Sequence, residues 1–467
     1  METNWLPRLD TNGETLHERI LDALRQDIGA GALAPGARMP TQRDLAHRLG
    51  IGVGTVTRAY AEAERMGLLT GRVGRGTFVA GGHATAGARA DQPLDLTMNL
   101  PPFGPAAARF ADVLSRLRRR PDIGTYVSLA PHAGFDEHRQ AAATWLARAA
   151  RFESVDWRRL LICNGSQQAL ALALDVACRR GDTVLVETAT FFGMKSLAEL
   201  RGLSLVGVAM DGEGILPEAL DRAAAESGAR LLYVQPTLQN PTARSMSRRR
   251  RDDIVAIARR RDLSILECGI YAPLALGGAN LDARAAEMLP LALLAPERTY
   301  YTSSVSKALA PGLRTGFLVT PDAARFDKSC AAMRATAYSV SALGPLIATQ
   351  WINDGTADEI LAEVGREAAN RTALAARILG QAIEAPSFAQ SLHVWLPFSE
   401  LEAERIAGRA LRHGVALTPP SAMLVAGAAG AGLRLCLSTP PDLPTLDRAL
   451  RVMAAAIAGD TEGRSVI

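Results

Sequence analysis

The sequence predicts an α/β protein in which a small helical head precedes a larger, mainly parallel sheet domain. Two observations carry this prediction. Residues 12–80 hold three short helical patterns and then two short strand patterns around a Gly-rich turn, the layout of a winged helix-turn-helix. Residues 94–460 alternate buried strand patterns with helical patterns, which favours a mainly parallel sheet covered by helices.

The elements follow in order along the chain. LHERILDALRQDI, PTQRDLAHRLG and GVGTVTRAYAEAER each place apolar residues at helical spacing, and LLTGRVGRGTFVA reads as the wing. Residues 81–93, GGHATAGARADQP, are small, polar and aperiodic, so we interpret them as a linker. The last segment, from SLHVWLPF to GLRLCLSTP, predicts a small C-terminal α+β subdomain.

Composition narrows the class of protein. The 467 residues, 48% hydrophobic and 21% charged, indicate a globular protein of two or three domains. No apolar run is long enough to span a bilayer, and the N-terminus has no export pattern. Five scattered cysteines without CxxC spacing favour reduced thiols and argue against a zinc site or a disulfide framework. We therefore expect a cytoplasmic protein without a metal, associated with the nucleoid when it binds DNA.

Charge points to the head as the part that meets a polyanion. The net charge is +4, and residues 36–80 alone hold seven arginines against three acidic residues. The third helical pattern would enter a major groove, and the glycines of the wing would let backbone approach a phosphate. The alternative is a solvated arginine face. The candidate contacts with double-stranded operator DNA are Thr41, Arg43, Thr55, Thr57, Arg58, Arg72 and Arg75.

The stretch PGARMPTQRDLAHRLGIGVGTVTRAYAEAERMGLLTGRVGRGTFV resembles the GntR family of bacterial repressors along its whole length. One residue departs from the family pattern. Many relatives have a DNA-contacting arginine where this chain has Val53. The resemblance then implies that Thr55 and Thr57 read bases, while Arg43, Arg58 and Arg75 contact phosphates or a groove.

A single lysine suggests the chemistry of the large domain. Of 52 basic residues only Lys195, Lys307 and Lys328 are lysines, and Lys307 lies in SSVSKALAPGLRTGF. A primary amine forms a Schiff base, which a guanidinium does not. The alternative is an exposed lysine without a role, and the surrounding motifs decide between the two.

These motifs converge on pyridoxal phosphate. NGSQQAL opens a helix after a strand, where free N–H groups suit a phosphate, and ETATFFG, QNPT and LECGIY end in residues able to stack on or hydrogen-bond to a pyridine ring. Each motif alone has a structural explanation. Their occurrence together, in this order and at the ends of strands, favours a shared binding site. The candidate cofactor contacts are Gly165, Ser166, Gln167, Phe191, Asn240, Tyr271, Ser304, Ser306 and Arg314, with Lys307 as the covalent residue and Arg434 as a clamp for an effector carboxylate.

Residues 94–460 resemble the fold-type I, pyridoxal-phosphate-dependent aminotransferases, and the GntR-like head in front of them resembles the MocR type of regulator. The resemblance implies a homodimer in which the heads dock on the partner's large domain. It also implies an effector that is the cofactor itself or an amino compound. Two other functions stay open: an active aminotransferase carrying a DNA-binding head, and a degenerate dimerisation scaffold that binds the cofactor weakly or not at all.

One departure bears on turnover. Relatives read E-x-D-x-Y where this chain has LECGIY, and their aspartate bonds the pyridine nitrogen. Gly269 stands at that position, so we expect slow proton abstraction at Cα and a site that senses more than it turns over. We expect Glu267 to share the strand face of Gly269, and Cys268 to point away from the ring.

Overall fold

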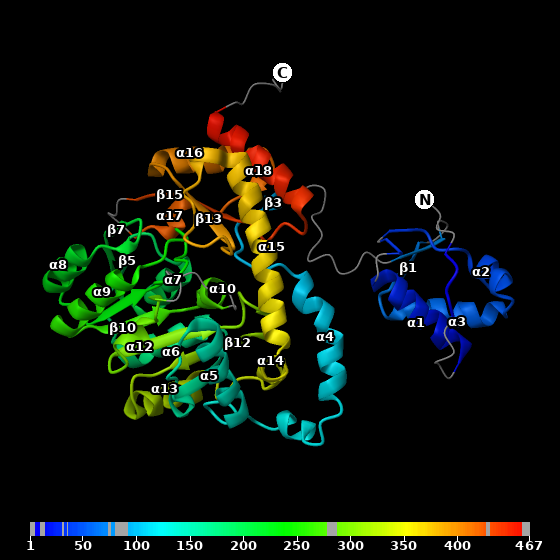
Figure 1. The fold of residues 1–467 in the computed structure, drawn as a ribbon, viewed down its shortest axis with the longest axis horizontal. Coiled ribbons are helices and arrows are strands. Elements are labelled where there is room, and N and C mark those ends of the chain that lie inside the picture. Colours follow the sequence, from blue (N-terminus) through cyan, green and yellow to red (C-terminus); the bar gives the residue numbers. More distant parts are fainter. Residues whose placement is uncertain are drawn as a thin grey trace. The chain divides into compact units, whose positions relative to one another are not determined.

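The computed structural model describes residues 5–9, 15–29, 32–34, 36–72, 76–79, 92–277, 287–425 and 430–459. The chain forms two compact units, Met1–Gln92 and Pro93–Ile467 (Figure 1). Most of the predicted linker 81–93 lies outside the described residues. No helix of the described part is long and apolar enough to cross a membrane.

The first unit is a winged helix-turn-helix, as predicted. Its elements are α1 (Leu16–Gly29), α2 (Gln42–Leu49), α3 (Val53–Arg65), β1 (Leu69–Arg72) and β2 (Gly76–Val79). The two strands pair antiparallel. Gly50 ends α2 with φ = +66°, a conformation that glycine adopts without steric cost, and the chain turns at once into α3. Leu45, Val56 and Tyr60 are buried in the core that holds the three helices together.

The second unit is built around a sheet of seven strands. Their order is β4 (Leu160–Asn164), β12 (Thr315–Val319), β11 (Thr299–Ser304), β10 (Ser264–Cys268), β9 (Leu231–Val234), β5 (Thr183–Glu187) and β6 (Ser204–Val208). Only β12 runs antiparallel to its two neighbours. The prediction of a mainly parallel sheet is therefore confirmed.

Helices cover both faces of this sheet, and each face has its own core. Leu266 and Val184 belong to one core and Ile265 and Leu185 to the other, so adjacent residues of a strand point to opposite faces. Helices of the first core are α5 (Asp136–Ala150), α6 (Ser166–Ala177), α7 (Phe192–Arg201), α10 (Ala272–Leu276), α13 (Ala323–Thr336) and α14 (Leu343–Asn353). Helices of the second are α8 (Pro217–Ser227), α9 (Arg248–Arg260) and α12 (Leu291–Leu294).

A third core belongs to the predicted C-terminal α+β subdomain. Its elements are β13 (His393–Pro397), α16 (Glu400–Arg412), β14 (Val415–Ala416), α17 (Pro420–Met423), β15 (Gly432–Cys436) and α18 (Leu443–Ala458). Strands β13 and β15 pair antiparallel, and β3 (Leu94–Asp95) joins the subdomain by pairing with β14. The long helix α15 (Thr356–Leu379) runs from the sheet toward this subdomain (Figure 1).

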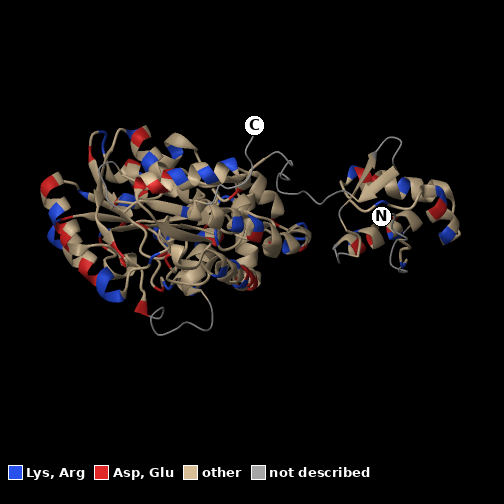
Figure 2. Cartoon of the chain, turned by 90° about the horizontal axis from the view of Figure 1, so that it is seen from above, with Lys and Arg blue, Asp and Glu red and all other residues tan. Residues whose placement is uncertain are grey.

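The remaining elements are short connections, apart from α4. They are α4 (Gly104–Leu117), η1 (Ile123–Val127), η2 (Trp157–Arg159), β7 (Met210–Asp211), β8 (Gly214–Ile215), η3 (Pro311–Leu313) and η4 (Gly380–Ala382). Acidic and basic residues are interspersed over the helices of both units (Figure 2).

Candidate functional site

The candidate cofactor residues follow the carboxyl ends of neighbouring strands. Gly165 comes directly after β4, Phe191 follows β5, Asn240 follows β9, Tyr271 follows β10 and Lys307 follows β11. These strands run in the same direction, because β4 and β11 are each antiparallel to β12. Their carboxyl ends therefore meet at one edge of the sheet, which is where ligands bind in folds of this kind.

An anion cradle lies where β4 passes into α6. Gly165 has φ = +78°, and a Cβ built on it would lie 2.4 Å from Nη2 of Arg314. The guanidinium thus rests against the backbone at the start of α6, where the first N–H groups of the helix have no partner within the helix. Arg314 itself donates to the Asn164 carbonyl at 3.1 Å. Only glycine leaves room for this arrangement.

Serines that follow β11 complete the polar side of the cradle. Ser304 is buried at the end of β11, and its Oγ accepts a hydrogen bond from the Ser306 amide at 3.2 Å. The Ser306 hydroxyl is buried and has no hydrogen-bond partner among the described residues. A buried hydroxyl without a partner is costly, and a bound ligand oxygen would satisfy it.

The other predicted residues at α6 and α7 pack together. Ser166 is the first residue of α6. Gln167 donates from Nε2 to the Gly193 carbonyl at 3.0 Å. A Cβ on Gly193 would lie 2.4 Å from the Phe191 ring, so the ring packs over that glycine. The side chain of Gln167 is thus used to hold the turn that carries Phe191.

Lys307 is half-buried and lies beside Asn99, which is not among the predicted site residues. Its Nζ donates to the carbonyl of Asn99, and Asn99 donates from Nδ2 to the Tyr271 hydroxyl at 2.8 Å. Burial, with a smaller contribution from the nearby Arg434 and Arg314 charges, lowers the pKa of Lys307 to about 8. A lysine with a lowered pKa holds more of its neutral, nucleophilic form near neutral pH. The part of the sequence that could have pointed to Asn99 is the segment MNLPP, residues 98–102.

His393 of β13 contacts the same Asn99 side chain. Its Nδ1 lies 2.8 Å from Asn99 Nδ2, and its Nε2 lies 3.1 Å from the Gln239 carbonyl. Burial and the Arg434 charge lower its pKa to about 3. His393 is therefore neutral at physiological pH and connects the C-terminal subdomain to the loop after β9.

Arg434 is a buried cation without a carboxylate partner among the described residues. Its Nη1 donates to Asn240 Oδ1 at 2.8 Å, and its Nη2 donates to the Thr97 carbonyl at 2.6 Å and to the Thr418 hydroxyl at 2.8 Å. Its Nε is buried and lacks a partner in the described structure. Buried charges are normally paired, so this geometry suits an anionic ligand group.

The segment LECGIY has no room for a side chain at position 269. A Cβ at position 269 would lie 2.0 Å from the Tyr301 hydroxyl, so Tyr301 fills the space in which a side chain would begin. Glu267 accepts a hydrogen bond from the Ala292 amide at 2.8 Å and interacts with Arg251. Cys268 is buried in the same core as Leu266, and its orientation away from the ring stays a prediction. Strand β10 ends at Cys268, so strict alternation does not extend to Gly269.

The thiol of Cys268 is neutral. Burial raises its pKa, although contacts with Thr302, Gln235 and Tyr233 act in the opposite direction. Neither Cys268 nor Gly269 therefore places a negative charge at the end of β10.

A buried carboxyl group, also not selected from the sequence, shapes the loop that carries Asn240. Glu187 accepts hydrogen bonds from the Gln235 amide at 3.2 Å and from Gln239 Nε2 at 3.1 Å. Gln235 Oε1 in turn accepts from the Asn240 amide at 2.8 Å. Burial raises the pKa of Glu187 to about 8. Glu187 therefore fixes the position of Asn240 through two glutamines.

Of the predicted DNA contacts, Arg43 lies on α2, and Thr55, Thr57 and Arg58 lie on α3. Arg43, Thr57 and Arg58 are exposed, and Thr55 is half-buried. Thr41 caps α2 by accepting a hydrogen bond from the Asp44 amide at 3.2 Å. The Arg72 side chain and the whole of Arg75 lie outside the described residues.

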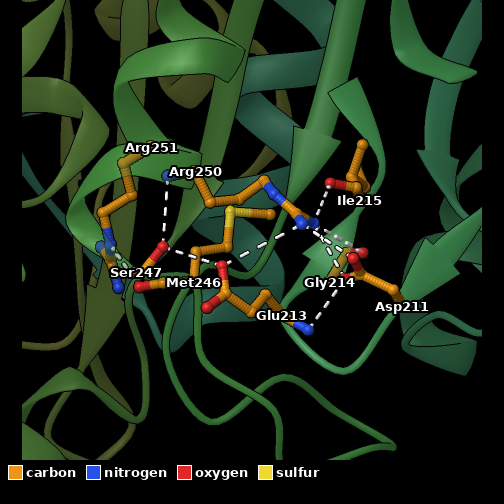
Figure 3. A network of polar contacts seen from close by, with 8 residues as sticks. All are labelled: Asp211, Glu213, Gly214, Ile215, Met246, Ser247, Arg250 and Arg251. Carbon is orange, nitrogen blue, oxygen red and sulfur yellow. Dashed lines mark hydrogen bonds and ion pairs between the residues drawn. The ribbon is translucent and has the colours of Figure 1, made fainter. Parts of the chain in front are cut away.

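A groove of about 790 Å³ lies between α8 and α9, away from Lys307. Figure 3 shows how its polar groups bond to one another: Arg250 bonds to Asp211 at 2.7 Å, and Ser247 donates to Glu213 at 2.8 Å. Arg260 is paired with Asp221 at 2.8 Å. Because these charges satisfy each other, we assign no ligand to this groove.

Known proteins share both units. Residues 91–452 match the family "Aminotransferase class I and II", and residues 16–79 match "Bacterial regulatory proteins, gntR family". The HTH-type transcriptional regulator YdeF of Bacillus subtilis is 30% identical over 322 residues, covering 68% of this chain and 67% of that protein. The vitamin B6 salvage pathway transcriptional repressor PtsJ of Salmonella typhimurium is 27% identical over 435 residues, covering 92% and 96%.

A solved structure shows the same fold in an enzyme. LysN, the α-aminoadipate aminotransferase of Thermus thermophilus, superposes with a TM-score of 0.69 at 25% identity, over 79% of this chain and 93% of the other. The fold and the matches define a GntR-type winged helix joined to an aminotransferase-like domain. The chain belongs to the aminotransferase class I and II family, in the MocR type of transcription regulator.

Proposed function

We propose that this protein is a DNA-binding transcription regulator whose large domain binds pyridoxal phosphate through Lys307 and senses the cofactor or an amino-compound effector. The observation that carries the proposal is the meeting of two features at one sheet edge. One is a lysine whose pKa is lowered to about 8. The other is an anion cradle in which Arg314 rests against Gly165.

The residues present fit the cofactor. Gly165, Arg314 and the unpartnered Ser306 hydroxyl would hold the phosphate, Phe191 would stack on the ring, and Asn240 and Tyr271 would bond the phenolic oxygen. When bound, the cofactor supplies an aldehyde for reversible covalent bonding to an amine. Lys307 provides that amine, and Asn99 orients it by accepting its hydrogen bond.

Sensing is favoured over turnover by the environment of Lys307. Position 269 has no side chain, since the Tyr301 hydroxyl fills the space where one would begin, and the buried Glu267 is engaged with the Ala292 amide. The pyridine nitrogen would therefore lack a carboxylate to keep it protonated, which weakens electron withdrawal from a bound amino compound. The relative PtsJ is a repressor of a vitamin B6 salvage pathway, which supports cofactor sensing.

An absorbance spectrum tests the proposal. Titration of the full-length protein with pyridoxal phosphate should produce a band from the lysine-bound cofactor. Lys307→Ala should abolish the band, and Lys328→Ala, which removes an exposed lysine, should retain it. A band of equal strength in Lys307→Ala, or none in the unmodified protein, would contradict cofactor binding at this site.

Regulation requires that cofactor and DNA affect each other. If the cofactor changes the affinity for DNA by some factor, DNA must change the affinity for the cofactor by the same factor. Both affinities are measured on one preparation, with duplexes selected from a random pool as the DNA probe. Equal affinities in the presence and absence of the other ligand would remove the sensing function and leave two independent activities.

The second candidate function is an aminotransferase that carries a DNA-binding head. The contact of Arg434 with Asn240 favours it, because this pair could orient a substrate carboxylate beside Lys307. The test is a half-reaction, in which a panel of amino acids is offered to the cofactor-loaded protein. Loss of the absorbance band together with formation of a keto acid would establish turnover. No keto acid from a broad panel supports sensing.

We further propose that the protein acts as a cytoplasmic homodimer. Large apolar side chains of the second unit are exposed: Phe103 by 66%, Val127 by 90% and Leu129 by 69%. Exposed apolar groups of this size are typical of surfaces that another protein covers. The mass measured by light scattering should be that of two chains, and Val127→Asp with Leu129→Asp should reduce it. A single-chain mass for the unmodified protein would contradict the dimer.

A further inference from the structure

The first turn of α3 carries an exposed apolar side chain. Val53 is the first residue of this helix, and 43% of its surface is exposed. The residues that hold α3 in the head are on another face, where Val56, Ala59 and Tyr60 are buried. Val53 therefore contributes little to the core of the head and is available to a partner.

The residues on both sides of Val53 have no side chains. Gly52 and Gly54 flank it, and a Cβ built on either glycine would meet no atom within 4 Å. Gly52 is the N-cap residue and gives no side-chain cap, so the first amides of α3 are without a capping side chain. Because neither glycine carries a Cβ, a surface placed against this end of the helix can approach the backbone around Val53 closely.

The neighbouring hydroxyl, one turn along α3, is engaged within the head. Thr57 Oγ1 lies 2.8 Å from Gln42 Oε1 and 3.0 Å from the Val53 carbonyl. The Thr57 hydroxyl therefore donates its proton to a hydrogen bond within the head. The contact also keeps the side chain of Gln42, at the start of α2, close to this end of α3. Val53 is left as the exposed apolar side chain of this turn.

The surrounding charges favour DNA as the partner. Arg43 and Arg58 are exposed on α2 and α3, and neither has an ion-pair partner within the described part of the head. The major groove presents one apolar group to a protein, the C5-methyl of thymine. We propose that Val53 reads a thymine methyl and so acts as a specificity-determining residue of the head. The inference rests on the proposed DNA binding.

Deoxyuridine tests this contact, because it lacks only that methyl group. The probe is the full-length protein with duplexes enriched from a random pool, in which each thymine is replaced singly by deoxyuridine. At one position per half-site the replacement should weaken binding about 3- to 10-fold, the effect expected for one buried methyl group. Val53→Ala should weaken binding to the thymine duplex by a similar factor and lose the response to deoxyuridine.

Two controls separate this contact from general effects. Leu16→Ala removes another exposed apolar side chain of the head, 44% exposed on α1, and should leave the response to deoxyuridine unchanged. Val53→Ala should also leave the salt dependence of binding unchanged, whereas Arg58→Ala should reduce its slope. Circular dichroism of each variant verifies that the head is folded.

The outcomes are distinct. Failure to enrich any duplex would overturn both the proposed DNA binding and this contact. Enrichment without sensitivity to deoxyuridine at any position would overturn the Val53 contact and leave DNA binding intact. A response to deoxyuridine that is equal in Val53→Ala and in the unmodified protein would assign the methyl group to another residue and also overturn the proposal.

Discussion

The Arg314 guanidinium fills the space into which a side chain at position 165 would project: a Cβ on Gly165 would lie 2.4 Å from it. Gly165 directly follows β4, and Arg314 directly precedes β12. These two strands pair antiparallel, with Thr315 opposite Asn164. This register places a cation at the N-terminus of α6. The absence of one side chain thus creates the anion cradle.

Gly165→Ala should therefore weaken binding of pyridoxal phosphate. Displacement of Arg314 removes a charge-assisted contact worth about 1.5–3 kcal/mol, which corresponds to roughly 10- to 100-fold in affinity. Affinity is measured by titration of the absorbance band. Gly181→Ala is the matched control, because Gly181 has φ = +92° but no atom within 4 Å of its Cβ position. Equal losses in both variants would attribute the effect to backbone strain.

Attachment of the cofactor should depend on pH through Lys307. Its pKa is lowered from 10.5 to about 8, so about a tenth of the amine is neutral at pH 7 and most is neutral at pH 9. The rate at which the band forms should rise through about pH 8 and reach a plateau above it. Stopped-flow measurements between pH 6 and 10 check this. A rate that still rises tenfold per pH unit at pH 10 would contradict a buried amine.

Local sequence patterns determined most of the fold prediction. Apolar periodicity identified the three helices of the head, and alternating strand and helix patterns identified the sheet. The contacts around Lys307 required the tertiary structure: Asn99 meets Tyr271 across 172 residues and His393 across 294 residues. No local pattern reports such pairings. The end of β10 also required the structure, because the strand stops at Cys268 and its alternation cannot be extended to Gly269.

Cys268→Asp should raise the pKa of Lys307. A carboxylate favours the charged form of a nearby amine, and typical shifts amount to about one unit or more. The pH midpoint for cofactor attachment should then move upward. Cys268→Ser, which places a neutral hydroxyl there, should leave the midpoint near that of the unmodified protein. If both variants give the same midpoint, Cys268 does not face Lys307.

The same substitution should increase turnover. A carboxylate near the ring would keep the pyridine nitrogen protonated, and a protonated ring withdraws electrons more strongly from a bound amino acid. Exchange of the amino acid Cα proton in deuterated water, followed by NMR, should be faster in Cys268→Asp than in Cys268→Ser. No difference in exchange would show that the missing carboxylate is not what limits this chemistry.

Glu187 should make stability depend on pH. Its pKa is raised from 4.5 to about 8 by burial, so the folded state retains a proton that the unfolded chain has already lost. Its contribution is complete below about pH 4.5 and is lost as the pH rises through about 8. Between pH 5.5 and 8.5 the Tm should therefore fall less in Glu187→Gln than in the unmodified protein, by roughly a few degrees.

The control for Glu187 is Glu226→Gln, a change at an exposed position of α8. It should reproduce the Tm profile of the unmodified protein across the same pH range. Parallel profiles for Glu187→Gln and the unmodified protein would show that Glu187 does not hold its proton. The amide retains the oxygen that accepts from the Gln235 and Gln239 N–H groups, so the loop carrying Asn240 should stay in place.

Arg434 should select effectors that carry a carboxylate. L-alanine and ethylamine both offer an amine to the lysine-bound cofactor, but only alanine offers an anion to the unpartnered Nε of this arginine. The unmodified protein should therefore bind alanine more tightly, by roughly 10- to 100-fold, as expected for one charge-assisted contact. Arg434→Gln should lose this preference because it removes the charge. The affinity for alanine should fall, and the affinity for ethylamine should change much less.

A buried arginine elsewhere in the same subdomain provides the comparison. Arg371 is buried, pairs with Glu367 at 2.8 Å and donates to the carbonyls of Leu437 and Pro440. Arg371→Lys should lower stability and leave the ratio of the two affinities unchanged, because its charge already has a carboxylate partner. Titrations of the absorbance band with each amine give the ratio directly. A ratio near one in the unmodified protein would mean that Arg434 stabilises the subdomain contact with Asn240 and does not read the ligand.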